Sequence, residues 1–238
     1  MNIVTLKEFD LGIPAEQVRS VPVTMGPDRE GVLFAYSMDE GVDPGEEYYH
    51  HPKDTLKLAF FDENGTKLWT KDLGQGVIPG IWFCPVISLD LNQDGVDEIY
   101  FLNNINPEAP FSFIYRKLEA IDPISGETIG RWDWPQNTFE ERLSLSYRFY
   151  LVAGYSHGEP VLITSQGTYG DMYLQGYGSG MVQKWETVIR DSDPGPRASH
   201  LTPVLDFNVV GVDELFWGER LLSVEDGHEV LCCDKYSY

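Results

Sequence analysis

The sequence is poor in basic residues, in cysteine and in long apolar runs. Seventeen Lys and Arg residues stand against 38 Asp and Glu in a chain of 238 residues, which gives a formal net charge of −21. A field of that sign repels phosphate backbones and anionic lipid headgroups, so nucleic acid and membrane surfaces are excluded as partners. The charge suits calcium or a surface that holds metal ions. It can equally serve solubility alone.

The few cysteines and the absence of a long apolar segment bear on the compartment. The three cysteines are Cys84, Cys232 and Cys233. An odd number that includes an adjacent pair does not make a disulfide framework, which favours a reducing compartment. The N-terminus has no basic segment followed by an apolar stretch, so no signal peptide is predicted. The longest uncharged run, residues 74–89, is too short and too interrupted by proline to span a bilayer. We therefore expect a cytoplasmic protein.

Helical periodicity is equally scarce, and residues 14–20 alone have a helix-like opening. Elsewhere, short runs rich in Val, Ile, Leu, Tyr and Phe are separated by Gly, Pro, Asn and Asp, a pattern typical of strands and turns. The 23 glycines and 15 prolines are spread along the chain. Many short strands are therefore expected, and the predicted fold class is all-β.

A strand, a glycine-bearing turn and a second strand recur four times. The turns lie at Gly65, Gly126, Gly180 and Gly227. Glycine supplies the positive φ that a tight hairpin needs. These turns are 61, 54 and 47 residues apart. A four-stranded β-propeller blade takes roughly 40–50 residues, so the spacing predicts blades with some insertions. No linker is visible, so residues 1–238 are expected to form one propeller-type domain. The alternative is a β-sandwich with unrelated hairpins.

Residues 90–98, with the sequence Asp-Leu-Asn-Gln-Asp-Gly-Val-Asp-Glu, carry the strongest motif. Oxygens at positions one, three and five can converge on a hard cation, and glycine at position six permits a sharp turn. Position seven offers a carbonyl and position nine completes the shell, whereas Asp97 at position eight should point away. The expected calcium ligands are Asp90, Asn92, Asp94, Val96 and Glu98. The alternative is an acidic turn that holds no ion.

A second copy of the motif, residues 206–214, is altered at one position. It keeps Asp206, Asn208 and Glu214, but Val210 replaces the oxygen donor at position five. This loss should weaken calcium binding, and the loop can survive as a structural turn. His200 precedes this loop, and a lone histidine is usually a surface or core residue. No phosphate-binding loop, nucleophile elbow or zinc-protease motif is present.

The order of the motifs adds information that no single motif carries. Residues 56–104 contain a strand, an Asp-x-x-Gly turn, Lys-Leu-Trp, Asp-Leu-Gly, an aromatic apolar run and then the first loop. Further matches are residues 9–12, 118–132, 148–155, 160–163, 167–169 and 184–185, followed by a histidine before the second loop. In this order the chain resembles the opening blades of the family 11 rhamnogalacturonan lyases, over nearly its whole length.

The resemblance implies a function. Enzymes of that family are calcium-dependent β-propellers that cleave rhamnogalacturonan I by β-elimination at galacturonate, where calcium on the uronate carboxylate acidifies the C5 proton. It implies about half of an eight-bladed propeller, Ca²⁺ as cofactor and an acidic or pectic polysaccharide as partner. His200 matches the family histidine that helps build the active-site metal centre. Tyr169 is a candidate for contact with substrate, since tyrosine can act as a general acid or base.

Departures from the family pattern leave three hypotheses. Residues 170–173 replace an arginine-rich stretch, and the family's later His-Gly-Asp segment and its proton-transfer lysine and tyrosine have no counterpart before Tyr238. The chain is accordingly expected to be a lyase-like protein without its catalytic half, which a second chain could complete. It is alternatively a non-catalytic carbohydrate-binding module, in which exposed Trp132, Trp134 and Trp217 stack on sugars, or a structural calcium-binding propeller.

Overall fold

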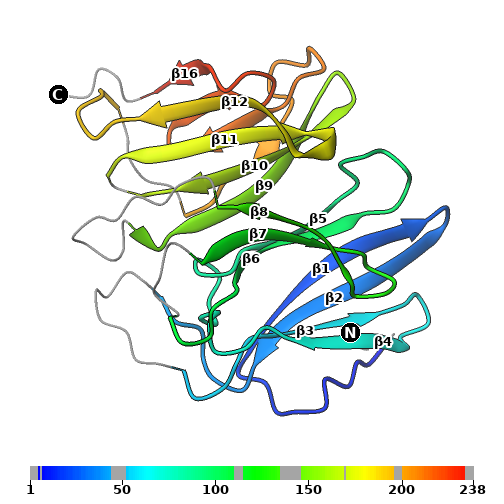
Figure 1. Ribbon diagram of the computed structural model, residues 1–238. Coiled ribbons are helices and arrows are strands. Elements are labelled where there is room, and N and C mark those ends of the chain that lie inside the picture. Colours follow the sequence, from blue (N-terminus) through cyan, green and yellow to red (C-terminus); the bar gives the residue numbers. More distant parts are fainter. Residues whose placement is uncertain are drawn as a thin grey trace. The chain divides into compact units, whose positions relative to one another are not determined.

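The described residues form four antiparallel sheets of four strands each (Figure 1). The computed structural model describes residues 5, 7–43, 52–109, 115–134, 146–168, 170–195 and 200–233. Within each sheet, strands that are consecutive in the chain lie side by side. The all-β prediction is confirmed, whereas closure of the sheets into a propeller stays a prediction.

The strands are assigned to sheets as follows. Sheet A contains β1 (Gln17–Gly26), β2 (Arg29–Ser37), β3 (Lys57–Phe61) and β4 (Lys67–Asp72). Sheet B contains β5 (Val86–Leu89), β6 (Glu98–Asn104), β7 (Arg116–Ile121) and β8 (Thr128–Asp133). Sheet C contains β9 (Phe149–Ser156), β10 (Glu159–Gln166), β11 (Met172–Gly178) and β12 (Val182–Ile189), with the 3-10 turn η2 (Ser179–Met181) before β12. Sheet D contains β13 (Val204–Leu205), β14 (Glu214–Trp217), β15 (Arg220–Ser223) and β16 (Glu229–Cys232).

The four turn glycines predicted from the sequence each join the third and fourth strands of a sheet. Gly65, Gly126, Gly180 and Gly227 have φ values of 82°, 72°, 68° and 72°. This left-handed region costs a residue with a Cβ atom about 1–2 kcal/mol. The hairpins therefore form where the sequence places glycine.

The helix-like opening expected at residues 14–20 is wrong. The segment enters β1, whose first six residues alternate between partly buried and exposed. β1 pairs with β2 from Gln17↔Ser37 to Val23↔Gly31, and this ladder satisfies its backbone groups. Pairing with a neighbouring strand thus outweighs a weak local helical preference.

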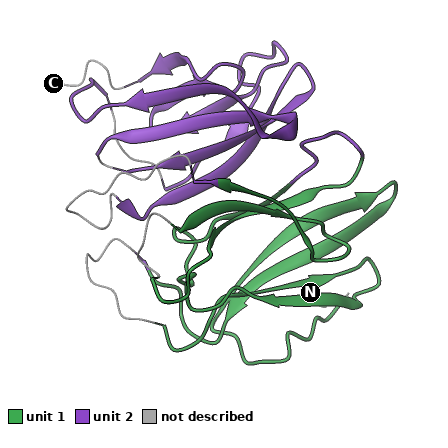
Figure 2. Ribbon diagram, in the orientation of Figure 1, with its two compact units in different colours: residues 1–42, 50–88, 95–132 green, residues 43–49, 89–94, 133–238 purple. Residues whose placement is uncertain are grey.

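The contacts within the chain divide it into two compact units (Figure 2). Unit 1 comprises residues 1–42, 50–88 and 95–132, and unit 2 comprises residues 43–49, 89–94 and 133–238. Sheets A and B belong to unit 1 apart from the terminal residues of β5 and β8, and sheets C and D belong to unit 2. The prediction of one domain is not tested by this division.

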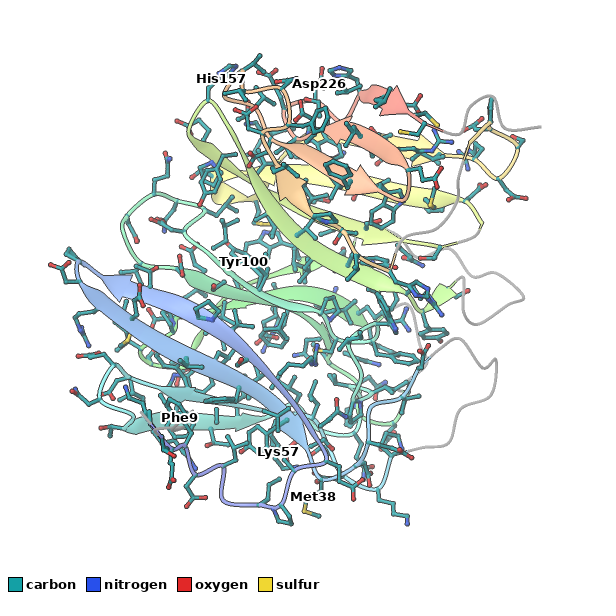
Figure 3. All side chains as sticks on the ribbon, turned by 180° about the vertical axis from the view of Figure 1, so that it is seen from behind. Phe9, Met38, Lys57, Tyr100, His157 and Asp226 are labelled. Atoms are coloured by element: carbon teal, nitrogen blue, oxygen red, sulfur yellow. The ribbon has the colours of Figure 1, made fainter. Side chains whose placement is uncertain are left out.

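Both faces of sheet A in unit 1 are covered. One face shares a buried apolar core with sheet B, in which Phe60 and Phe101 are both fully buried. Segment 9–15 lies on the other face, where alternate residues pack against Tyr36, Ala59 and Phe61. Phe9, labelled in Figure 3, has its ring centroid 5.1 Å from that of Phe61. Such edge-to-face aromatic pairs add to the gain from burial.

Unit 2 contains a close approach that requires glycine. A Cβ atom at Gly154 of β9 would lie 2.7 Å from Val204 Cγ1 and 2.9 Å from Val224 Cγ2. These distances are below van der Waals contact, so sheet D packs against the bare backbone of β9 at this point.

A tryptophan plays the same part in both units. Trp69 Nε1 of β4 donates to Pro123 O at 2.7 Å, and Trp185 Nε1 of β12 donates to Val224 O at 2.8 Å. Each indole also packs on the turn glycine of the next sheet, where a Cβ atom would meet the ring at 2.8 Å for Gly126 and 2.5 Å for Gly227. Trp69 therefore joins sheet A to sheet B, and Trp185 joins sheet C to sheet D.

Two general properties bear on the expected environment. Cys84, Cys232 and Cys233 are all free. Within the described part of the chain, none of the helices has the length and apolar character needed to cross a membrane.

Candidate functional site

The first predicted calcium loop, residues 90–98, connects β5 to β6. Asp90 Oδ1 and Asn92 Oδ1 lie 3.0 and 2.8 Å from the same backbone nitrogen, that of Asp94. Gln93 and Gly95 have φ values of 61° and 92°, which curl the loop around these groups. Two side-chain oxygens expected to be calcium ligands thus turn toward the interior of the loop.

The ninth residue of this loop, Glu98, is the first residue of β6. It is 8% exposed, and Tyr100 Oη donates to its Oε2 at 3.2 Å. An ionised carboxylate at this depth needs compensation by hydrogen bonds or an opposite charge. The role of closing calcium ligand that the motif assigns to Glu98 stays a prediction.

The eighth residue, Asp97, has a structural role that the motif does not predict. Its backbone nitrogen donates to Thr24 O at 2.9 Å, and its Oδ2 accepts from the backbone nitrogen of Thr24 at 2.7 Å. Asp97 therefore points away from the loop interior, as expected, and fastens the loop to β1. We call this pair of hydrogen bonds the first joint.

The second loop, residues 206–214, repeats this backbone in unit 2. Val209 and Gly211, at positions four and six, have φ values of 60° and 87°. Asp213 N donates to Tyr155 O at 2.8 Å, and Asp213 Oδ2 accepts from Tyr155 N at 2.7 Å. We call this the second joint, since it fastens the loop to β9 as Asp97 fastens the first loop to β1.

The interior of the second loop is held by its own hydrogen bonds. Asn208 Nδ2 donates to Glu214 Oε1 at 2.8 Å. Phe207 N donates to the other oxygen of Glu214, also at 2.8 Å. Asp206 accepts from the backbone nitrogens of Val210 and Gly211 at 3.0 and 2.8 Å.

These contacts allow a test of fit for calcium. In the first loop, the carboxylate of Asp90 and the amide oxygen of Asn92 face inward, which is the donor chemistry that Ca²⁺ prefers. In the second loop, Val210 offers no side-chain oxygen, and the Asn208 amide nitrogen donates to Glu214. The first loop thus turns two of its five expected oxygen donors inward, and the second lacks the donor at position five; calcium binding by either loop stays a prediction. Among the described residues, no group of three or more His, Cys, Asp or Glu side chains is arranged to hold a metal.

His200, the histidine before the second loop, contacts an arginine. Arg148 Nη1 lies 2.6 Å from His200 Nε2, and Arg148 Nη2 lies 3.5 Å from Asp43 Oδ1. A guanidinium only donates, so Nε2 must accept and the ring proton lies on Nδ1. A metal ion at Nε2 would have to replace Arg148. The predicted metal-binding part of His200 stays a prediction.

The aromatic residues that were expected to contact sugar differ in how far they are exposed. Tyr169 lies outside the described residues. Trp134 and Trp217 are each 1% exposed, so the expectation that they stack on sugars is wrong. Trp134 packs against Phe149, and Trp217 Nε1 donates to Met172 Sδ. Trp132 is partly buried. These large aromatic side chains lie in the core because their burial removes the most apolar surface from water.

A cavity of about 430 Å³ in unit 1 was not foreseen from the sequence. Its lining includes Lys71, Asp72, Asn103, Asn104 and Arg131. These polar residues come from the ends of β4 and β6 and from β8. They meet only in the folded chain, so no local sequence pattern marks the cavity.

A buried carboxylate orients the arginine of this cavity. Glu119, whose side chain is fully buried, accepts from Arg131 Nε and Asn103 Nδ2 at 2.7 Å and from Thr128 Oγ1 at 2.6 Å. Burial raises the pKa of Glu119, but these hydrogen bonds lower it by more, so its pKa lies below the usual value. The bond to Glu119 raises the pKa of Arg131. The arginine is thus held as a cation, with 49% of its side chain exposed.

Comparison with known proteins gives a likeness of fold. No protein-family model matches the sequence, and no curated protein matches it. Among solved structures, the exotype rhamnogalacturonan lyase YesX is 18% identical with a TM-score of 0.72, over 88% of this chain and 41% of that one. Rhamnogalacturonan lyase YesW is 18% identical with a TM-score of 0.69, over 91% and 43%. The Bacillus licheniformis rhamnogalacturonan lyase PL11 is 16% identical with a TM-score of 0.73, over 90% and 42%.

The three solved structures cover similar shares of this chain and of their own length. Each covers most of this chain, and this chain spans about two fifths of each. Identity below one fifth establishes a shared fold and leaves residue roles to be argued from the chain itself. The chain therefore has the fold of the matched two fifths of rhamnogalacturonan lyases.

Proposed function

We propose that this chain binds an acidic pectic polysaccharide of the rhamnogalacturonan type, as a lyase-like, calcium-binding β-sheet protein. The likeness of fold to three rhamnogalacturonan lyases over about nine tenths of the chain carries the proposal. In this proposal the four sheets are propeller blades, a second chain supplies further blades, and the protein is cytoplasmic. The three free cysteines support a reducing compartment.

The cavity in unit 1 supports binding of a charged sugar. At about 430 Å³ it lies within the size range of small-molecule sites. Lys71 and Arg131 offer cationic donors in a chain of strong negative charge. Arg131 Nε and Nη2 already donate to Glu119, so Nη1 is the donor that Arg131 offers to a ligand carboxylate. Asp72 and Asn104 offer hydrogen-bonding groups of the kind that sugar hydroxyls use. A galacturonate residue is the ligand whose groups fit this set.

Calcium is proposed for the first loop, held by Asp90, Asn92, Asp94, the Val96 carbonyl and Glu98. When bound there, the ion would neutralise carboxylates in a loop that otherwise adds to the negative charge. In β-elimination a calcium ion supplies Lewis-acid polarisation of the uronate carboxylate. The chain's own contribution to that chemistry is to hold the sugar at Arg131 and Lys71.

Proton abstraction is the step for which the described residues offer least. A general base must reach the proton it removes with a free acceptor. His200 Nε2 already accepts from Arg148. We therefore propose binding as the activity of this chain by itself, with elimination requiring groups beyond those described.

One set of assays separates the three hypotheses. Calcium-loaded protein is mixed with rhamnogalacturonan I while ultraviolet absorbance, which reports the unsaturated product, and retardation on immobilised polysaccharide are followed. Retardation without absorbance change is expected. Arg131→Gln should weaken it, whereas Arg29→Gln, at the start of β2 and outside the lining of this cavity, should not. Absorbance that grows and stops on chelation would instead show a lyase. If the protein is not retarded and the absorbance does not change, the chain is a structural module and the proposal is overturned.

A further inference from the structure

The two faces of sheet D have different surroundings. On one face, Val204 and Val224 approach Gly154 of β9. Trp217 Nε1, on the same face, donates to Met172 Sδ of β11. These side chains therefore face sheet C within unit 2. Because successive residues of a strand point to opposite faces, the residues that alternate with them lie on the other side of sheet D.

Four apolar side chains lie on that other side, and we call them the open face: Leu205, Phe207, Phe216 and Leu231. Leu205 of β13 pairs with Glu214, two residues before Phe216 on β14. Leu221 of β15 pairs with both Phe216 and Leu231, and the ring centroids of Phe207 and Phe216 lie 6.2 Å apart. Leu205, Phe207 and Leu231 are 43%, 59% and 46% exposed.

The equivalent positions of the first loop are apolar but buried. Leu89 directly precedes the first loop as Leu205 precedes the second, and Leu91 and Phe207 are the second residues of the two loops. The left-handed residues at positions four and six of both loops support this equivalence. Leu89 and Leu91 are 5% and 2% exposed, far less than Leu205 and Phe207. Sheet D thus leaves exposed a set of positions that the fold buries elsewhere.

The fourth strand of sheet D supports the same conclusion. Sheets A, C and D each have a register shift between their third and fourth strands, and the fourth-strand residue paired just before it is Trp69, Trp185 or Leu231. Trp69 packs on sheet B and Trp185 packs on sheet D. Leu231 has the same place in its sheet, yet 46% of it is exposed. The open face is therefore the face that packs on a following sheet within each unit.

Sheet faces elsewhere in the described part of the chain are covered. Segment 9–15 packs on the outer face of sheet A, where Phe61 is 2% exposed. Tyr100 of sheet B, the equivalent of Phe216, is 4% exposed, and Leu162 of sheet C is fully buried. An exposed apolar cluster with such equivalents is typical of an interaction site. A second copy of the chain would meet the first with its own open face.

We propose that two copies of this chain associate through their open faces around a two-fold axis. The inference deepens the proposed function, on whose second chain it rests, by naming that chain as another copy. The packing of sheet A on B and of sheet C on D shows that a sheet fits this face. A two-fold contact uses the same patch on both copies, so Phe207 and Leu231 of each copy become buried.

The size and charge of the contact set its strength. The strands of sheet D have two to four residues, so the interface is small and a dissociation constant in the micromolar range is expected. Each copy has a net charge of −21, and the two copies therefore repel each other at low ionic strength. Salt screens exposed charges, so association should become tighter as the salt concentration rises.

Sedimentation equilibrium of the full chain, over a range of protein concentrations and at low and high salt, tests the proposal. We expect a reversible monomer–dimer equilibrium that shifts toward dimer in high salt. A monomer at every concentration and salt level would overturn the proposal. A series of larger oligomers without a stop at the dimer would overturn the two-fold geometry, because a two-fold contact closes on itself.

Charged variants locate the contact. Phe207→Glu and Leu231→Glu should each raise the dissociation constant at least tenfold, since a carboxylate would be buried without a partner. Ile129→Glu is the matched control, because Ile129 of β8 is 55% exposed and lies in another sheet. Urea unfolding checks that all three variants are folded. A dimer that survives Phe207→Glu and Leu231→Glu, or that Ile129→Glu weakens equally, would overturn the assignment.

Polysaccharide binding is read separately from association. The proposed sugar-binding cavity lies in unit 1, at Lys71 and Arg131, and the open face lies in unit 2. Phe207→Glu should therefore be a monomer that is still retarded on immobilised polysaccharide. A dimer that is not retarded would overturn the proposed function alone, and a monomeric wild-type chain that is retarded would overturn the association alone.

Discussion

Val209 is the residue whose replacement tests the loop conformation most simply. It has a φ of 60° and is 86% exposed. A β-branched residue in the left-handed region is a steric outlier that costs about 1–2 kcal/mol, whereas asparagine tolerates this region. Exposure means that little apolar burial is lost on replacement. Val209→Asn should therefore raise the free energy of unfolding by about 1 kcal/mol.

The size of the effect makes it measurable. For a chain of this length, about 1 kcal/mol corresponds to a rise in melting temperature of about 2–4 °C. Urea unfolding followed by tryptophan fluorescence should show a higher midpoint with an unchanged slope. Coincident transitions by fluorescence and circular dichroism would establish that both units unfold together, which the comparison of free energies requires.

A matched control isolates the backbone as the cause. Val182 is 65% exposed but has a φ of −77° in extended conformation. Val182→Asn relieves no left-handed strain and should leave stability unchanged or slightly lower, since asparagine is a poor strand former. A gain at both positions, or at neither, would refute the argument from Val209.

Three further predictions concern a hairpin, a buried carboxylate and the thiols. Gly126→Ala should destabilise the protein by about 2 kcal/mol. The loss should exceed that of Gly180→Ala, because a Cβ atom at Gly126 would meet the Trp69 ring at 2.8 Å whereas Gly180 has open space. Chemical unfolding of both variants checks this. Glu119 has a lowered pKa in the fold, so its stabilisation is present above its unfolded pKa and lost as pH falls through the folded value; stability measured from pH 7 to pH 2 should fall less steeply in Glu119→Gln. Burial raises the pKa of the Cys84 thiol to about 11, so alkylation at pH 8 should label exposed Cys233 and spare Cys84 until the protein unfolds; mass spectrometry of peptides reads the result.

Local signals in the sequence predicted the elements that depend on local conformation. The four turn glycines marked hairpins because only glycine adopts their φ without cost. The spacing of residues 90–98 predicted a curled loop, and Asp90 and Asn92 do turn their oxygens inward. In these cases the backbone requirement and the residue that meets it lie within a few positions of each other.

Features that depend on contacts between distant residues were not predicted. Trp134 and Trp217 were expected on the surface, yet both are buried, since exposure is decided by which sheets pack together. The joints pair Asp97 with Thr24 and Asp213 with Tyr155, across separations of more than fifty residues. No spacing rule reaches that far in a single sequence. The recurrence of an aspartate at position eight of both loops, Asp97 and Asp213, is the sequence signal that could have indicated the joints.

The measurement that tests the central claim most directly is calorimetric titration of the calcium-loaded chain with rhamnogalacturonan I oligosaccharides, with neutral galactan oligosaccharides as the comparison. The account predicts saturable binding of the acidic oligosaccharide that weakens at least tenfold in Arg131→Gln, and none of the neutral one. Equal binding of both, or of neither, would contradict it.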